Sequence, residues 1–147
     1  MFSILIYSGV RIGGLVKLNE KNIDYEKGLF VAQEKKTKNS SGFNTSFLPR
    51  KFMPELTSFI KMKDRYEERV IQISTKQVRK RLKKYREKWY PHLFRHTIRY
   101  LWHKKGMPKP EGTALLNHMP KDVDEVYLRM LRNRKYLRKQ YDKYFPY

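Results

Sequence analysis

Apolar residues recur at helical spacing along this chain, and basic residues fill most of the positions between them. One such stretch has Val78, Leu82, Tyr85 and Trp89 as its apolar positions. Helices with this pattern bury one face and leave a cationic face exposed. With 147 residues, 39% of them hydrophobic, the chain can form one domain with a single apolar core. We therefore expect a mainly α fold with a small antiparallel β-hairpin or sheet.

Local signals divide the chain into helices and one hairpin. Residues 1–18 have near-helical spacing, which Ser8 and Gly9 interrupt, so a kink or helix boundary is expected there. Extended runs at both ends of 29–48 predict a β-hairpin with a long tip. The other expected features are a helix over 55–67, a capping box of Ser74 and Gln77 before the next helix, a helix over 92–105 that stops at Gly106, a short helix over 111–117, and a last helix that Asp122 caps and that carries Tyr127.

The net charge of the chain limits the kinds of partner that it is expected to bind. Lys and Arg number 34 and Asp and Glu 14, which gives a formal net charge of +20. Such a domain is expected to bind a polyanion, most often nucleic acid, with an anionic membrane surface as the alternative. No apolar run reaches the ~20 residues of a spanning helix. The absence of cysteine excludes disulfides, thiolate zinc sites and a cysteine nucleophile, and fits an intracellular protein.

A histidine and an arginine lie on one face of the helix expected over 92–105. His92 and Arg95 are three residues apart, so that a cation and a proton-sharing group can contact one phosphate. Cleavage of a phosphodiester needs cations for the non-bridging oxygens, a nucleophile for phosphorus and an acid for the leaving alkoxide. His96, the next residue, is interpreted as a core or capping histidine.

The surrounding segments resemble the motifs of the tyrosine recombinase family, the phage-type integrases. The run His-Leu-Phe-Arg-His-Thr at 92–97 is followed by Leu-Leu-Asn-His at 115–118 and then by Tyr127. The separations, 118 − 95 = 23 and 127 − 118 = 9, are similar to the family's. Earlier in the chain, Ser-Gly-Val-Arg-Ile at 8–12 resembles the family's first-arginine segment, and a lysine-rich hairpin follows it.

The resemblance implies a role for each matching residue and requires no metal or cofactor. Arg11 and Arg95 would clamp the phosphate, His92 and His118 would bond its oxygens or assist proton movement, and Tyr127 would attack phosphorus to form a 3′-phosphotyrosyl bond. Lys38, or alternatively Lys36, would protonate the leaving 5′ oxygen; Lys35 also competes for this position.

Two positions depart from the family pattern. Gly14 stands where the family often has a glutamate three residues after its first arginine, so another group must orient Arg11. Asn117 replaces the usual glycine before His118, which affects the local turn. By the same resemblance, residues 1–127 are the catalytic domain, and 128–147 are a basic C-terminal tail or helix that can dock on an adjacent protomer. By the same resemblance, the family's N-terminal core-binding domain is expected to be missing from this chain, and the chain is expected to be a fragment.

The function that the resemblance implies is site-specific DNA recombination or integration, as in a virus or plasmid. Its partners would be double-stranded DNA attachment sites and further copies of the chain, as a tetramer on DNA and a monomer or dimer when free, inside the host cell. One alternative is a nicking and closing enzyme like a type IB topoisomerase. Another is a non-catalytic DNA-binding module, and a membrane-surface or RNA-binding domain ranks last. The basic residues expected to contact the DNA backbone are Lys76, Arg79, Lys80 and Lys83.

Overall fold

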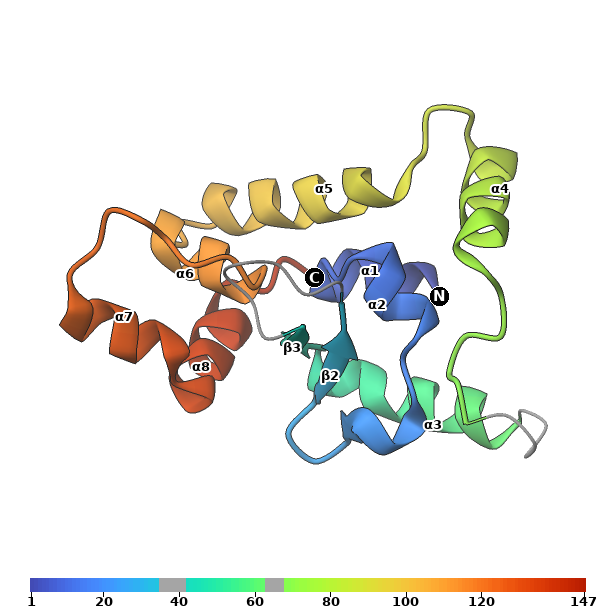
Figure 1. Ribbon diagram of the computed structural model, residues 1–147, viewed down its shortest axis with the longest axis horizontal. Helices are drawn as coiled ribbons and strands as arrows, with labels where there is room; N and C mark the ends of the chain where they lie inside the picture. The colour runs from blue at the N-terminus through green and yellow to red at the C-terminus, as the bar shows by residue number, and fades with distance from the viewer. Residues whose placement is uncertain (35–41, 63–67) are drawn as a thin grey trace.

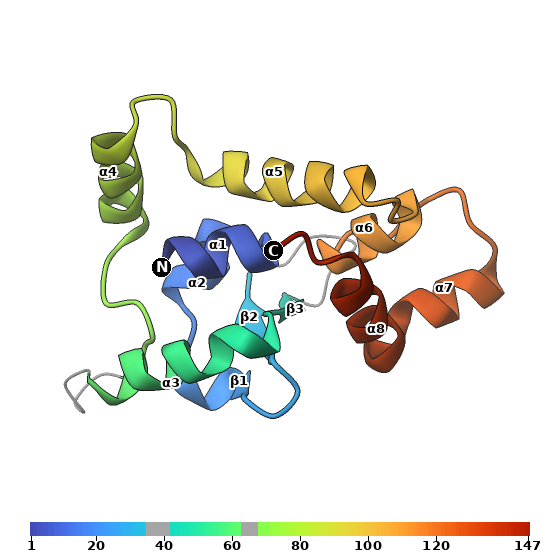
Figure 2. The ribbon, with the colours of Figure 1, turned by 180° about the vertical axis from the view of Figure 1, so that it is seen from behind.

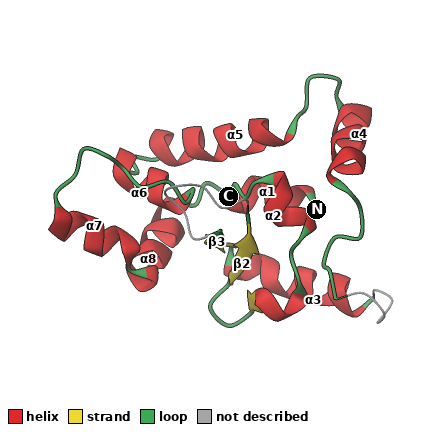
Figure 3. Cartoon of the chain, viewed as in Figure 1, coloured by secondary structure: helices red, strands yellow, loops and turns green. Residues whose placement is uncertain are grey.

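The computed structural model describes residues 1–34, 42–62 and 68–147. Within them the chain is mainly helical and has one antiparallel sheet in the order β1-β2-β3, which confirms the expected fold class (Figure 1; Figure 3). The elements are α1 (Phe2–Ser8), α2 (Ile12–Val16), β1 (Ile23–Asp24), β2 (Leu29–Gln33), β3 (Phe43–Phe47), α3 (Met53–Lys61), α4 (Thr75–Tyr85), α5 (Pro91–Lys104), α6 (Lys109–Leu115), α7 (Glu125–Arg132) and α8 (Arg134–Tyr144), with 3₁₀ turns at Glu20–Asn22 and Arg50–Phe52.

The sheet lies between two apolar clusters. Phe30 and Ala32 belong to a cluster with α1 to α4, whereas Leu29 and Phe47, paired across β2 and β3, belong to a cluster with α5 to α8. This alternation is what the period of two in a strand produces. Helix α5 runs along α1, with α4 at one end of the molecule and α7 and α8 at the other (Figure 2).

The expected break between the first two helices is present, and steric constraints at Gly9 fix its position. Gly9 ends α1 with φ 63, a left-handed conformation that glycine adopts without strain. A Cβ at Gly9 would lie 2.6 Å from Cδ2 of Leu116, so no larger residue fits without movement. The Ser8 hydroxyl donates to the Ile4 carbonyl and accepts from the Val10 amide, which completes the turn. The turn places Arg11 at the N-cap of α2.

Several boundaries differ from the sequence-based expectations. The capping box of Ser74 and Gln77 is present, but α4 ends at Tyr85 rather than continuing to Trp89. The Trp89 ring lies 5.6 Å from that of Phe94 and packs against the core beyond the end of α4. The predicted cap of the last helix was wrong as well: Asp124, not Asp122, accepts from the Tyr127 amide.

Residues beyond 127 are helical and pack on their own chain. Helix α7 crosses this position, and α8 follows with Tyr141 fully buried. The Tyr141 hydroxyl donates to the Tyr7 carbonyl at 2.9 Å, and Nη1 of Arg138 donates to the carbonyls of Gly28 and Leu48, each at 2.8 Å. Helix α8 is therefore tied to α1 and to the start of β2. In the described part of the chain, no helix has the length and apolarity to cross a membrane.

Replacing Arg138 with Met is expected to lower the free energy of unfolding by about 2 kcal/mol, because it removes the Arg138 donor from the buried carbonyl of Leu48 and one of the two donors to the carbonyl of Gly28. Lys139, exposed on the same helix, provides the control, and Lys139→Met should stay within about 0.5 kcal/mol of the wild type. Urea unfolding followed by circular dichroism measures both changes. Equal effects would contradict a specific role for Arg138.

Candidate active site

Arg95 lies at the centre of the site and joins two distant parts of the chain. It is buried on α5 with 7% of its surface exposed. Its Nη1 donates to the Gly9 carbonyl at 2.6 Å, and its Nη2 donates to the Leu116 carbonyl. Burial, and next the nearby Arg11 charge, lower its pKa to about 10, so the guanidinium stays protonated at neutral pH. With five N–H groups available, it keeps donors for a further ligand.

Arg11 lies beside Arg95 and is held by a carboxylate. Its guanidinium forms an ion pair with Glu34, whose Oε1 also accepts from the Arg11 amide at 3.3 Å. Asn44 donates to Glu34 Oε2 at 2.8 Å. Glu34, directly after β2, is therefore the group that orients Arg11 in the absence of an acid at position 14. Sequence reasoning required such a group but did not identify it, and the only signal was the glycine.

His118 completes the contact with Arg11. Nη2 of Arg11 lies 2.9 Å from Nε2 of His118. Because a guanidinium only donates, Nε2 accepts, and the ring is neutral with its proton on Nδ1. Burial lowers the His118 pKa, and the charges of Arg95 and Arg11 lower it further. The neutral form is thus the one that the surroundings favour.

The turn before His118 uses asparagine where glycine was expected. Asn117 has φ 57, and it is the only described non-glycine residue with a positive φ. Asparagine tolerates the left-handed region better than other residues with a side chain. The Asn117 amide donates to the Ala114 carbonyl at 2.8 Å, and the His118 amide donates to that of Thr113 at 3.1 Å. The substitution therefore keeps the turn that presents His118.

His92 lies one turn before Arg95 on the exposed side of α5. Burial is the largest cause of its lowered pKa, followed by the charges of Arg95, His96, Arg11 and Arg79. His92 therefore senses the same cationic cluster as His118. The interpretation of His96 as a core residue was wrong, because its side chain is exposed beside His92 with ring centroids 6.3 Å apart.

Tyr127 is not joined to this cluster. Its hydroxyl donates to Oε1 of Glu111 at 2.5 Å, and the Tyr136 hydroxyl donates to the same oxygen at 2.7 Å. Glu111 is 2% exposed, and its Oε2 has no hydrogen-bond partner among the described residues. Burial, and then Glu111, raise the Tyr127 pKa to about 12. Helix α7, which carries Tyr127, lies at the end of the molecule away from α2 (Figure 1).

The remaining candidates lie at the margins of the site. Lys35, Lys36 and Lys38 fall in 35–41, outside the described residues. Four basic residues, spaced to share one side of α4, are exposed: Lys76, Arg79, Lys80 and Lys83. Arg79 contributes to the lowered pKa of His92, so this basic side of α4 adjoins the cluster. In the ranges 1–34, 42–62 and 68–147, no three His, Asp or Glu side chains are grouped as a metal site requires.

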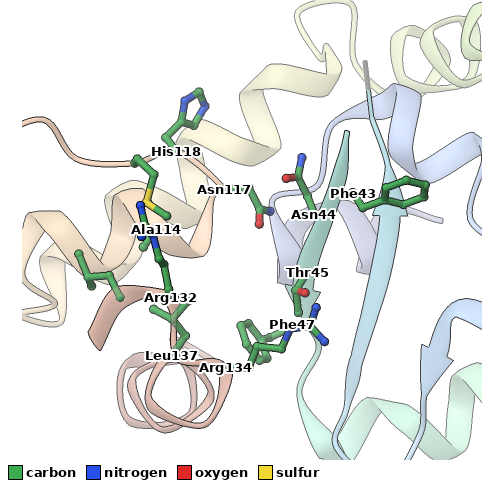
Figure 4. A pocket seen from close by; sticks show the side chains of 12 residues that line it. Phe43, Asn44, Thr45, Phe47, Ala114, Asn117, His118, Arg132, Arg134 and Leu137 are labelled. Atoms are coloured by element: carbon green, nitrogen blue, oxygen red, sulfur yellow. The ribbon is translucent and has the colours of Figure 1, made fainter. Parts of the chain in front are cut away.

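A pocket of about 410 Å³ adjoins His118 between β3 and the α6–α8 segment (Figure 4). Asn44 on β3 and Asn117 after α6 lie on its two sides, and Arg132 and Arg134 contribute positive charge. Asn44 also binds Glu34, so one wall of the pocket is continuous with the Arg11 site.

Solved structures of other proteins share the fold of this chain. The crystal structure of XerA recombinase superposes with a TM-score of 0.68 and 17% identity, over 99% of this chain and 57% of that one. This chain has the fold of a tyrosine recombinase catalytic domain. The Tn1549 transposon integrase, in complex with circular intermediate DNA, matches with a TM-score of 0.63 and 16% identity, over 90% of this chain and 56% of that one.

No protein-family model matches the chain, and no curated protein matches it. The chain spans slightly more than half the length of the recombinase structures that share its fold.

Replacing Glu111 with Gln is expected to lower the Tyr127 pKa from about 12 toward the ordinary value of about 10, because the ionised acceptor is lost while burial remains. NMR of tyrosine labelled with ¹³C at Cζ, titrated between pH 8 and 12.5, measures it. Glu125→Gln, an exposed change on α7, is the control. An unchanged Tyr127 pKa in Glu111→Gln would contradict the hydrogen bond.

Proposed function

We propose that this chain is the catalytic part of a site-specific DNA recombinase or integrase, which cleaves and rejoins strands through Tyr127. The observation that supports this most directly is the convergence of Arg11, Arg95 and His118 from distant segments onto one cationic site. The recombinase fold and the integrase–DNA complex with the same fold agree with it. A +20 chain suits a DNA partner.

The proposed roles follow from charge and hydrogen bonding. Arg11 and Arg95 bind the non-bridging oxygens of the scissile phosphate and stabilise the charge that builds up on them. His118, beside Arg11, donates to the same phosphate. His92, whose pKa is lowered by burial and then by the surrounding cations, accepts the phenolic proton of Tyr127.

The covalent step exchanges one phosphoester bond for another. The Tyr127 oxygen bonds to phosphorus as the P–O5′ bond breaks, and Lys38, or alternatively Lys36, gives a proton to the leaving oxygen. The 3′-phosphotyrosyl bond keeps the phosphate activated, so a 5′-hydroxyl from another strand can restore the DNA backbone. Strand exchange between two duplexes requires four copies of the chain, assembled as a tetramer on attachment sites inside the host cell.

Attack by Tyr127 requires it to leave Glu111. The phenol must exchange this hydrogen bond for the arginine cluster of its own or a neighbouring protomer. The present position of Tyr127 favours one alternative function, a DNA-binding module without strand cleavage. The fate of Tyr127 on DNA therefore separates the two proposals.

Trapping on a nicked suicide duplex tests the proposal, with supercoiled plasmid as substrate while the attachment site is unknown. The wild-type chain is expected to form a covalent DNA adduct on a denaturing gel, and Tyr127→Phe is expected to form none, because only Tyr127 supplies the attacking oxygen. Tyr136→Phe is a matched control, since it also removes a phenol from Glu111, and it should keep the adduct.

An adduct that persists in Tyr127→Phe would move the nucleophile to another tyrosine. Absence of any adduct on a verified site would favour the binding module. Relaxation of a supercoiled plasmid without recombination of two sites would point instead to the nicking and closing activity.

Neutralising the basic side of α4 is expected to reduce the salt dependence of DNA binding. Lys80→Gln with Lys83→Gln removes two cations, so the slope of log K against log[salt] should fall in magnitude by up to about 1.8. Fluorescence anisotropy at several salt concentrations measures it. The control, Lys135→Gln with Lys139→Gln, removes the same charge from α8 at the other end of the molecule. Equal slopes for both variants would remove α4 from the DNA interface.

A further inference from the structure

Glu34 is a buried carboxylate whose bonds all lead to the arginine site or to the hairpin. Its side chain is 4% exposed, against 35% for that of Arg11. It accepts from the Arg11 guanidinium, from the Arg11 amide at 3.3 Å and from Asn44 at 2.8 Å. A buried carboxylate without such donors would be strongly destabilising. Glu34 therefore holds Arg11 at its inner end and leaves the outer part of the guanidinium open to solvent.

Glu34 also defines the base of the hairpin. Its amide donates to the Gly42 carbonyl at 2.7 Å, so Glu34 and Gly42 close the described ends of the segment 35–41. The candidate lysines Lys36 and Lys38 lie in that segment of the sequence. Glu34, which binds Arg11, therefore also directly precedes the segment that carries the candidate lysines.

The missing side chain of Gly14 provides the space for Glu34. A Cβ built on Gly14 would lie 3.0 Å from Cβ of Ala32 and 3.1 Å from Cγ of Glu34, both closer than ordinary contacts. Gly13, its neighbour in α2, would meet nothing within 4 Å. Helix α2 thus packs directly on the end of β2, and the stem of Glu34 lies against Gly14.

We propose that Glu34 is a positioning residue for the cleavage reaction. It holds Arg11 beside His118 so that both face the scissile phosphate. Gly14, which has no side chain, leaves the space that the Glu34 side chain requires. This inference rests on the proposed function. The negative charge of Glu34 opposes binding of a phosphate, so its benefit lies in the geometry of Arg11 rather than in DNA affinity. A residue with this role affects the rate of cleavage and not the tightness of binding.

The first test compares Glu34→Gln with Asp24→Asn. Both remove one negative charge from the same sheet, but Asp24 pairs with Lys27 and has no contact with Arg11. Single-turnover adduct formation should fall about 10²-fold in Glu34→Gln, the size of effect that a displaced group has at a reacting centre. Its DNA affinity should equal or exceed that of Asp24→Asn, which should cleave like the wild type. Equal cleavage rates in the two variants would overturn the proposal.

The second test needs no DNA and reports on Arg11 directly. Burial lowers the His92 pKa most, and the charges of Arg95, His96, Arg11 and Arg79 lower it further. If Glu34→Gln releases Arg11, the His92 pKa measured by NMR rises; if Arg11 stays in place, it is unchanged. An unchanged His92 pKa would overturn the proposal.

The His118 pKa is an independent measure of whether Arg11 stays in place. Burial lowers the His118 pKa most, the charges of Arg95, Arg11 and Arg99 lower it further, and Glu34 raises it by less than Arg11 lowers it. Its pKa in Glu34→Gln therefore rises if Arg11 leaves and falls if Arg11 stays. The pKa values of His92 and His118 could both rise in Glu34→Gln while the wild-type chain forms no DNA adduct. That result would support the role of Glu34 in holding Arg11 and would contradict the recombinase function.

The third test uses the adjacent glycines. Gly14→Ala should displace Glu34 and slow cleavage, whereas Gly13→Ala, with open space around it, should cleave normally. Because both changes act through Arg11, Gly14→Ala with Glu34→Gln should be little slower than Glu34→Gln alone. Thermal unfolding of each variant separates slow cleavage from loss of folded protein. Multiplicative effects in the double variant would show that Gly14 acts independently of Glu34.

Discussion

The buried guanidinium of Arg95 is the interaction on which the site depends. It donates to the carbonyls of Gly9 and Leu116, which are the C-caps of α1 and α6. Carbonyls at helix C-termini lack intrahelical partners and carry partial negative charge, so a cation there is favourable. Arg11 and His118 each follow one of these two carbonyls by two residues. Their meeting at 2.9 Å is thus a consequence of how Arg95 holds the two helix ends.

The chain differs from the family pattern at two positions and satisfies the physical requirement in another way at each. Gly14 stands in place of the acid expected after Arg11, and Glu34, directly after β2, lies against this glycine and binds the arginine. Asn117 replaces a glycine and still adopts the left-handed turn. In both cases the requirement is geometric, an oriented guanidinium or a positive φ, and more than one residue type can meet it.

The proposed nucleophile, Tyr127, is bound to a carboxylate and not to the arginine cluster. Glu111 binds the hydroxyls of Tyr127 and Tyr136, and burial beside this carboxylate disfavours the phenolate. The cationic cluster and Tyr127 are formed separately within one chain. In the proposed reaction, Tyr127 must therefore leave Glu111 to reach the arginine cluster of its own chain or of a neighbour.

The sequence by itself predicted most of the helices and the two longer strands, and it named Arg11, Arg95 and His118 as site residues, because periodicity, capping residues and motif order are local properties. Its errors were at Asp122, Trp89 and His96, where packing or solvent exposure decides. Only the tertiary structure identified Glu34 as the group that holds Arg11 and placed Tyr127 on Glu111. These partners are 23 and 16 residues apart in the sequence, and no local pattern encodes which carboxylate a distant side chain meets once the helices have packed.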